Sequence, residues 1–316
     1  SGLRGRRGAG RAMKGLELCR AYYLRCARDE LRRRFGARAE RIAAGLAGEG
    51  SECLGFDDKI SRDHDFGPGF CLWLTDEDFA AFGEELRRFY AELPAEFMGF
   101  RRIMTPQSAG RVGVARIGDF YARFTGCRGI PESEAAWLRI PEHALAAATS
   151  GEVFDDPPGE FTRVREALLP CYPEDVRLKK LAARLFAMAQ AGQYNYPRTV
   201  KRGDAVAASL ALAEFTKAAL SALHLLNRRY APYYKWLWRS AAELPKLSEA
   251  ARETAALFEP NAERENLIES ICARVRAELA AQGLSSSDDP FLVAQAVETT
   301  RRIKNEYLRK LSVTAG

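Results

Sequence analysis

Two carboxylates near the start of the chain have the spacing of a metal site. Asp63 and Asp65 are separated by one residue, and residues two apart in a strand point to the same face of a sheet, about 7 Å apart along the chain. Mg²⁺ takes oxygen ligands and usually binds one or two protein carboxylates together with substrate phosphates. A strand over 63–74 would therefore let the two side chains share one Mg²⁺ or Mn²⁺ ion.

A short stretch upstream has the composition of a phosphate-binding turn. It reads Gly48-Glu49-Gly50-Ser51, and glycine lets the backbone come close to a ligand. N–H groups at the start of a following helix would attract anions, and Ser51 adds a hydroxyl donor. We expect Gly50 and Ser51 to hold the β- and γ-phosphates of an NTP, with ATP as the expected nucleotide. The alternative is a glycine-rich turn beside an acidic loop without a ligand.

These residues resemble the signature of the DNA polymerase β-like nucleotidyltransferase superfamily, in which Gly-Ser is followed by Asp-x-Asp on the next strand. A closer match looks like an uncharacterised bacterial family of that superfamily, a domain of unknown function, with the motif Gly-Glu-Gly-Ser-Glu-Cys and then Arg-Asp-His-Asp-Phe-Gly. The matching stretches are Gly48–Pro68, Gly118–Tyr121, Gly151–Phe154 and Tyr230–Trp236. The resemblance spans roughly Met13 to Leu257 and implies metal-dependent transfer of an NMP from an NTP.

The chain departs from the superfamily at the third carboxylate, which members commonly carry on a following strand. The strand predicted over 111–117 holds no acidic residue, although nucleotidyl transfer works best with two metals that clamp the attacking and leaving oxygens. Asp119 and Glu152 are the available substitutes. For Asp119 we favour a role as the N-cap of the next helix, and the alternative for Glu152 is an exposed strand or turn residue.

Length and periodicity predict an α+β chain with two domains. The 316 residues suffice for a sizeable core. We expect a disordered basic leader (1–12), a small mixed-sheet nucleotidyltransferase-like domain (13–160) and a mostly helical domain (161–316). In the first domain the patterns predict helices over 14–35 and from Thr75 to Pro94, with strands over 41–47, 63–74 and 111–117. In the second they predict helices over 174–191, 205–227, 247–258, 262–282 and 291–310.

The positive charge lies at one end of the chain. The first 50 residues contain thirteen Lys and Arg against five Asp and Glu, whereas the whole chain has a net charge of +6. The body is therefore not basic, and nucleic acid finds little support as a partner. Met13 is a plausible start, and an RNA-tethering arm is the alternative for residues 1–12.

No signal peptide is evident, and no uninterrupted apolar run approaches the about 20 residues that a membrane span requires. We therefore expect a cytoplasmic protein without a membrane partner, and its oligomeric state is open. The seven cysteines are scattered and never form Cys-x-x-Cys, which argues against disulfides and zinc. We expect reduced, mostly buried thiols, and we do not expect Cys53 to be a nucleophile.

An aromatic stretch, Tyr230–Trp238, lies in the helical half. Superfamily relatives place the nucleotide against a helical domain, so the resemblance implies that Lys235 neutralises a phosphate while an aromatic ring stacks on the base. The alternative is that these rings pack helices together. We interpret His224, on an apolar helix face, as structural.

The sequence thus predicts an enzyme in which Asp63 and Asp65 hold the metal and Asp119 or Glu152 completes the site. The acceptor is a small molecule, a protein side chain or an RNA end, and the sequence does not choose among them. A non-catalytic NTP sensor on the same fold is the main alternative, because the third carboxylate is missing from its strand. A scaffold that needs no metal is a further one.

Overall fold

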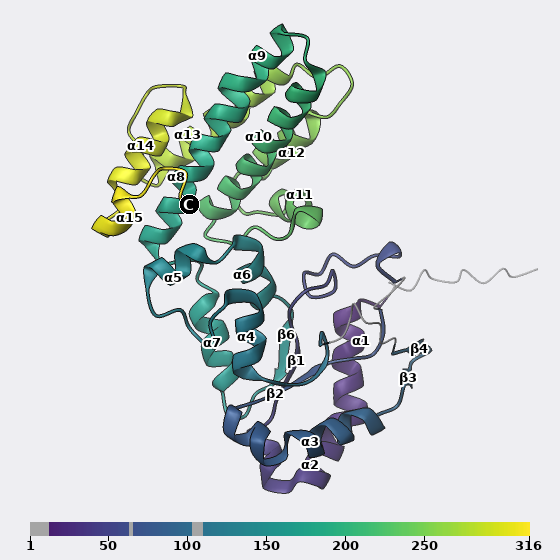
Figure 1. Cartoon of the computed structure of the whole chain (residues 1–316). Coiled ribbons are helices and arrows are strands. Elements are labelled where there is room, and N and C mark those ends of the chain that lie inside the picture. Colours follow the sequence, from purple (N-terminus) through teal and green to yellow (C-terminus); the bar gives the residue numbers. More distant parts are fainter. Residues whose placement is uncertain (1–12, 63–65, 103–109) are drawn as a thin grey trace, which may run out of the picture. The chain divides into compact units, whose positions relative to one another are not determined.

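The computed structural model describes residues 13–62, 66–102 and 110–316. The chain divides into two compact units (Figure 1). Unit 1 comprises Ser1–Arg123 and Ala147–Arg165, and unit 2 comprises Phe124–Ala146 and Glu166–Gly316. The chain therefore leaves unit 1, contributes a short segment to unit 2, and returns before it completes unit 2.

Unit 1 is built on a four-stranded mixed sheet with the strand order β5-β2-β1-β6. β1 (Ala43–Leu46) pairs antiparallel with both β2 (Cys71–Leu74) and β6 (Glu152–Asp155), whereas β5 (Gly113–Arg116) runs parallel to β2. The short strands β3 (Glu96–Phe97) and β4 (Phe100–Arg101) form a separate hairpin. This arrangement confirms the predicted α+β class with a small mixed sheet.

The helical elements of unit 1 include short π and 3-10 segments besides α-helices. They are α1 (Gly15–Tyr22), η1 (Tyr23–Ala27), α2 (Arg28–Phe35), η2 (Gly36–Arg41), η3 (Ile60–Arg62), α3 (Asp76–Glu92), α4 (Ile117–Thr125, whose last two residues belong to unit 2) and α7 (Glu160–Leu168, whose last three residues belong to unit 2). The predicted cap of α3 is confirmed, because the Thr75 hydroxyl accepts a hydrogen bond from the Asp78 N–H at 3.2 Å.

Both faces of the sheet are covered, and in Figure 1 the strands lie between α1 and α4. Leu72 and Leu74 belong to a core cluster with residues of α1, α2 and α3. Trp73, between them, stacks on Phe161 of α7 with 3.8 Å between ring centroids and meets Phe120 of α4 edge-on. Neighbouring residues of a strand point to opposite faces, so β2 is buried on both sides.

The second predicted strand is shorter than expected. β2 begins at Cys71, and residues 66–70 are not in a strand. Two glycines and a proline in Gly67-Pro68-Gly69 explain the late start, because proline donates no ladder hydrogen bond and glycine weakens a strand. Asp63 and Asp65 lie outside the described residues, so the expectation that they share a strand face stays a prediction.

Unit 2 is helical, as the sequence predicts for the second half of the chain. Its elements are α5 (Glu134–Arg139), α6 (Glu142–Ala148, whose last two residues belong to unit 1), α8 (Glu174–Met188), η4 (Ala189–Asn195), α9 (Tyr196–Lys201), α10 (Ala205–Leu226), α11 (Tyr234–Ala242), α12 (Ser248–Ala256), α13 (Arg264–Ala281), α14 (Leu292–Arg301) and α15 (Glu306–Lys310). The single helix predicted over 291–310 is two helices. Asn305 caps the second one, since its side chain accepts from the Leu308 N–H at 3.1 Å.

Among the described residues, α10 is the one helix long and apolar enough to cross a membrane. This finding corrects the expectation that no apolar segment reaches such a length. Its C-terminal half, from Ala218 to Leu226, is buried within unit 2, and its middle carries Glu214 and Lys217. By length and composition alone, the central helix of a helical bundle passes the same test.

Candidate functional site

The predicted phosphate turn lies directly after β1 and contains two glycines with positive φ. The φ angles are 110° at Gly48 and 135° at Gly50, a backbone region that other residues rarely adopt. A Cβ at Gly50 would lie 2.7 Å from both carboxylate oxygens of Glu52 and would also meet the Arg111 guanidinium. Any other residue would therefore be strained at this position and would also force the Glu52 and Arg111 side chains to shift.

The turn is fastened to the loop that precedes β6. The Ser150 hydroxyl donates to the Gly48 carbonyl at 2.7 Å, and the Gly151 N–H donates to the Cys53 carbonyl at 2.8 Å. Arg165 in turn donates to the carbonyls of Ser150 and Gly151, at 2.7 and 3.1 Å. Neutral and charge-assisted hydrogen bonds thus fix the backbone of the turn from one side.

Two guanidinium groups converge on the turn, one from the bend before β5 and one from α4. Arg111 donates to the Glu49 carbonyl at 2.8 Å and pairs with the Glu52 carboxylate, and these two side chains are only 17% and 18% exposed. Arg123 pairs with the Glu49 carboxylate at 2.5 Å and donates to the Gly110 carbonyl at 3.2 Å. The turn therefore carries two cations that planar anions recognise well.

The cations at the turn are these two arginines, each paired with a carboxylate of the turn, and no helix start adds to them. Residues 51–55 continue as turn, and the next helical element after Ser51 is the three-residue η3. A helix start directly after Ser51 is therefore not found, because a helix cannot run through Gly55, whose φ is 76°, and the one brief helix in this stretch is η3. Arg111 and Arg123 could not be found from the sequence, since single arginines have no motif spacing.

The two substitutes for a third carboxylate both have arginine partners. Asp119 lies in the first turn of α4, so it is not the N-cap that we favoured, and it pairs with Arg116 at 3.5 Å. Glu152 pairs with Arg20 at 2.8 Å, and its backbone lies opposite Leu46 in the β1–β6 ladder. Glu152 therefore lies beside the strand that leads into the turn.

The cysteines near the turn are inert thiols. Burial raises the pKa of Cys19 and of Cys71 to about 12, and it raises the pKa of Cys53 well above its ordinary value. All seven cysteines are free and five are buried. The expectation of reduced, mostly buried thiols is confirmed, and a protonated Cys53 is no nucleophile.

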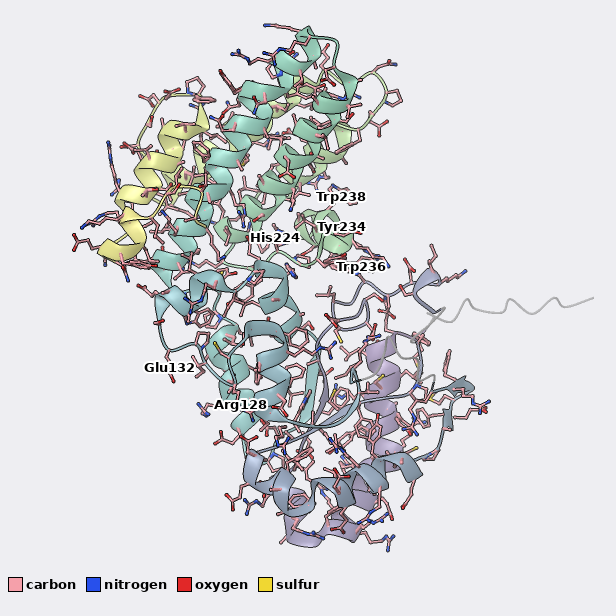
Figure 2. The ribbon with its side chains drawn as sticks, viewed as in Figure 1. Arg128, Glu132, His224, Tyr234, Trp236 and Trp238 are labelled. Carbon is pink, nitrogen blue, oxygen red and sulfur yellow. The ribbon has the colours of Figure 1, made fainter. Side chains whose placement is uncertain are left out.

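The aromatic stretch of unit 2 divides into packing rings and exposed rings. Tyr230 is a packing residue, since its hydroxyl donates to the Leu168 carbonyl at 2.6 Å. His224 is structural as predicted, since its ring nitrogens lie 2.7 Å from the Leu220 carbonyl and 2.9 Å from the Ser240 hydroxyl. Tyr234, Trp236 and Trp238 project from α11 (Figure 2). Lys235 is exposed beside Trp236, 5.2 Å from its ring centre, and its phosphate contact stays a prediction.

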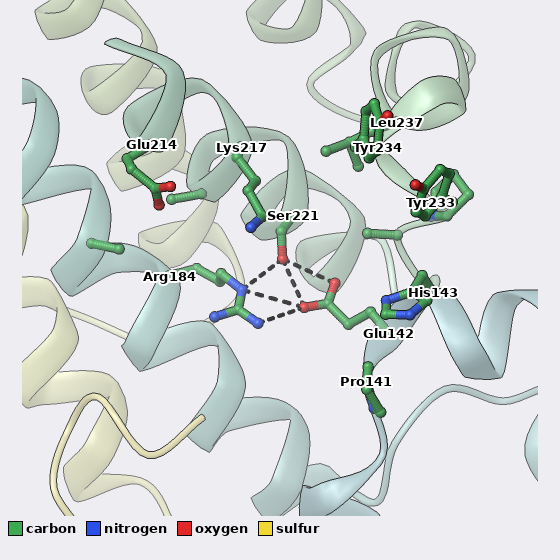
Figure 3. Close-up of a pocket in the computed structure, with 14 residues that line it drawn as sticks. Pro141, Glu142, His143, Arg184, Glu214, Lys217, Ser221, Tyr233, Tyr234 and Leu237 are labelled. Carbon is green, nitrogen blue, oxygen red and sulfur yellow. Dashed lines mark hydrogen bonds and ion pairs between the residues drawn. The ribbon is translucent and has the colours of Figure 1, made fainter. Parts of the chain in front are cut away.

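Unit 2 contains a cavity of about 420 Å³ that the sequence analysis did not find. Figure 3 shows it between residues of α6, α8, α10 and the start of α11. Its polar lining consists of Glu142, His143, Arg184, Glu214, Lys217, Ser221, Tyr233 and Tyr234, and apolar side chains such as Leu237 complete it. These residues come from four separate segments, so no local motif could reveal the cavity.

A buried polar network forms the base of this cavity. Glu142, 7% exposed, accepts hydrogen bonds from Arg184 at 3.1 and 3.3 Å, both at Oε1. The Ser221 hydroxyl lies 2.8 Å from Oε1 and 2.9 Å from Oε2, and it accepts from Arg184 Nε at 2.8 Å. A hydroxyl has one proton, so Ser221 can donate to only one of the two oxygens at a time.

The fold and the turn define an α+β protein with a small mixed sheet and a helical unit. The sequence model of a family described as "Domain of unknown function (DUF4037)" matches residues 137–237. This segment includes every residue that lines the cavity of unit 2, and it excludes the Gly-Ser turn.

Among solved structures, a nucleotidyltransferase-like protein from Exiguobacterium sibiricum 255-15 is similar to this chain. The sequence identity is 11% and the TM-score is 0.36, over 86% of this chain and 79% of that chain. No curated protein matches the sequence.

Proposed function

We propose that the chain is a metal-dependent nucleotidyltransferase that moves an NMP from an NTP to an acceptor. The observation that carries the proposal is the Gly48–Ser51 turn, whose two glycines have positive φ angles and whose flanks hold two guanidinium groups. Close backbone approach and bidentate cations are what a triphosphate requires. In this function Gly50 and Ser51 meet the β- and γ-phosphates, and Arg111 and Arg123 exchange their partners Glu52 and Glu49 for the phosphates.

We assign the metal to Asp63 and Asp65, because carboxylate oxygens are the ligands that Mg²⁺ prefers in proteins. Among residues 13–62, 66–102 and 110–316, no three His, Cys, Asp or Glu side chains gather into a group that could hold a metal. Two carboxylates next to substrate phosphates suit Mg²⁺, which when bound would neutralise phosphate charge. The acceptor hydroxyl would need a base, and Glu152, beside β1, is the better placed of the two remaining acids.

The arginine partners of Asp119 and Glu152 favour a second function, an NTP sensor without turnover. A carboxylate engaged in an ion pair must leave that pair before it can ligate a metal or accept a proton, and here Arg116 and Arg20 are the ion-pair partners. In the sensor the same turn binds NTP, and no acceptor is modified.

Two experiments test both functions, each with Mg²⁺ or Mn²⁺. Calorimetry measures ATP binding, and incubation with α-labelled NTPs and a cell extract, which supplies the acceptor, measures label transfer. We expect wild type to bind ATP and to transfer label, and Asp63→Asn with Asp65→Asn to abolish metal-dependent binding. Asp288→Asn, an exposed acid in unit 2, is the matched control and should behave as wild type. Metal-dependent binding without label transfer or pyrophosphate release would favour the sensor, and unchanged ATP affinity in the double variant would refute both.

A further inference from the structure

The cavity in unit 2 has the composition of a site for a small organic molecule. Eight of its fourteen lining residues are polar or charged and six are apolar, and ligand pockets combine apolar surface with polar groups that fix the orientation of the ligand. The base is the network of Glu142, Arg184 and Ser221, and the walls come from α10 on one side and from Tyr233 and Tyr234 on the other (Figure 3). Nothing in the proposed nucleotidyl transfer uses these residues.

Oε2 of Glu142, at the bottom of the cavity, can accept a further hydrogen bond. Both Arg184 donors reach Oε1 of Glu142, so Oε2 receives only the hydroxyl proton of Ser221, which Oε1 shares. An ionised carboxylate oxygen has two acceptor sites, and burial makes an unfilled site costly. A ligand with N–H donors, such as an ammonium group, would fill it.

The rim of the cavity carries one acidic and one basic side chain, and neither has an ion-pair partner in the described part of the chain. Glu214 and Lys217 are exposed residues three apart on α10, so their side chains lie on the same helix face. A purely cationic ligand would meet Lys217, and a purely anionic ligand would meet Glu214 and Glu142. A ligand that carries both a positive and a negative group would meet an opposite charge for each of them.

The opposite wall supplies aromatic surface. Tyr233 and Tyr234 are 54% and 72% exposed, with ring centres 4.4 Å apart and planes tilted by 48°. The His143 ring lies 6.3 Å from that of Tyr233, nearly perpendicular to it. Tilted and edge-on geometries are the ones in which aromatic rings attract each other, and Leu237 adds apolar surface.

We propose that this cavity binds a free α-amino acid with an aromatic side chain. Glu142 at the base holds the ammonium group, Lys217 holds the carboxylate, and Tyr233 and Tyr234 contact the ring, while Glu214 at the rim repels a purely anionic ligand. The cavity volume of about 420 Å³ accommodates one such molecule.

The test is isothermal titration calorimetry on the full chain with three matched compounds and without NTP. L-phenylalanine carries both charges, 2-phenylethylamine lacks the carboxylate, and 3-phenylpropanoate lacks the ammonium group. We expect saturable 1:1 binding of L-phenylalanine. Each analogue should bind at least about tenfold more weakly than L-phenylalanine, because each lacks one charged hydrogen-bonding group.

Two variants assign the charges. Lys217→Met should bind L-phenylalanine and 2-phenylethylamine alike, and Glu214→Gln should reduce the preference over 3-phenylpropanoate. Lys201→Met and Glu265→Gln replace exposed residues of unit 2 that do not line the cavity, and they should bind as wild type does. Equal affinity for the three compounds, or no saturable binding of L-phenylalanine, L-tyrosine or L-tryptophan, would overturn the proposal. Since the assay contains no NTP, its failure leaves the nucleotidyltransferase proposal untouched.

Discussion

Replacing Gly50 by alanine tests whether the turn after β1 is a phosphate site. Gly50 has a φ of 135°, and an added Cβ would lie 2.7 Å from the Glu52 carboxylate oxygens and would meet Arg111 as well. Gly55 offers a matched control, because it also has a positive φ, 76°, but a Cβ there meets no atom within 4 Å. Both variants place a side chain at a positive φ, and only Gly50→Ala also displaces the Arg111–Glu52 ion pair.

The expected costs follow from these contacts. Gly55→Ala should lower the free energy of unfolding by about 1 kcal/mol, the strain of a left-handed residue less the gain from a stiffer unfolded chain. Gly50→Ala should cost about 4 kcal/mol, because strain of roughly 1–3 kcal/mol adds to the lost charged hydrogen bonds between Arg111 and Glu52, about 1.5–3 kcal/mol. ATP affinity should fall about tenfold to hundredfold only in Gly50→Ala.

Urea unfolding gives the stabilities, and calorimetry with Mn²⁺ gives the ATP affinities. If Gly50→Ala does not fold, Arg111→Met replaces it, since that change leaves the glycine backbone unstrained and removes the same cation. Equal ATP affinity for Gly50→Ala, or for Arg111→Met, and for Gly55→Ala would refute the assignment of the turn to phosphate.

Three further changes probe the same reasoning. Ser51→Ala should weaken ATP binding about tenfold to hundredfold and leave adenosine binding unchanged, since only the triphosphate meets the hydroxyl; equal losses for both would contradict the placement. Glu152→Gln should lower label transfer by about 10²–10⁴-fold with ATP binding preserved if Glu152 is the base, whereas Asp119→Asn, its matched control, should lower it less; equal effects would contradict that choice. In unit 2, hydrogen bonds from Arg177, and less strongly from Arg228, lower the pKa of Glu174 to about 2 from an ordinary 4.5. The charged form of Glu174 is therefore the one that stabilises the fold. It contributes about 1 kcal/mol to the free energy of unfolding, a small value because the side chain is half-exposed. This contribution is complete above pH 4.5 and is lost as the pH falls toward 2. Glu174→Gln should remove this acid-dependent loss in urea unfolding, and an unchanged profile would contradict the assignment.

The sequence predicts the fold well where periodicity is long. The helices predicted over 205–227 and 262–282 are found as α10 (Ala205–Leu226) and α13 (Arg264–Ala281). It fails where tertiary contacts decide, as at β6, which is a strand because it pairs with β1 from more than 100 residues away. It also gives no warning of Lys179 and Lys180, which are buried in α8; Lys179 donates to the Leu311 carbonyl at 2.6 Å.

The candidate sites follow the same rule. The glycines of the turn were found because their backbone requirement is local. Arg111 and Arg123 were missed because only the folded unit brings them to the turn, from the bend before β5 and from α4. The cavity of unit 2 is hidden from the sequence for the same reason, since Glu142, Arg184 and Ser221 are brought together by three different helices.

The pairing of the turn with the Ser150 loop determines when the site can exist during synthesis. Gly48 and Ser150 are 102 residues apart, and the segment between them includes the excursion into unit 2. A nascent chain that has emerged only as far as α4 has β1 as an unpaired sheet edge, and such edges invite association with other chains. The turn becomes rigid only after β6 has joined the sheet. A fragment ending at Arg123 should therefore aggregate, and a shortened protein that keeps the turn must also keep the returning segment Ala147–Arg165.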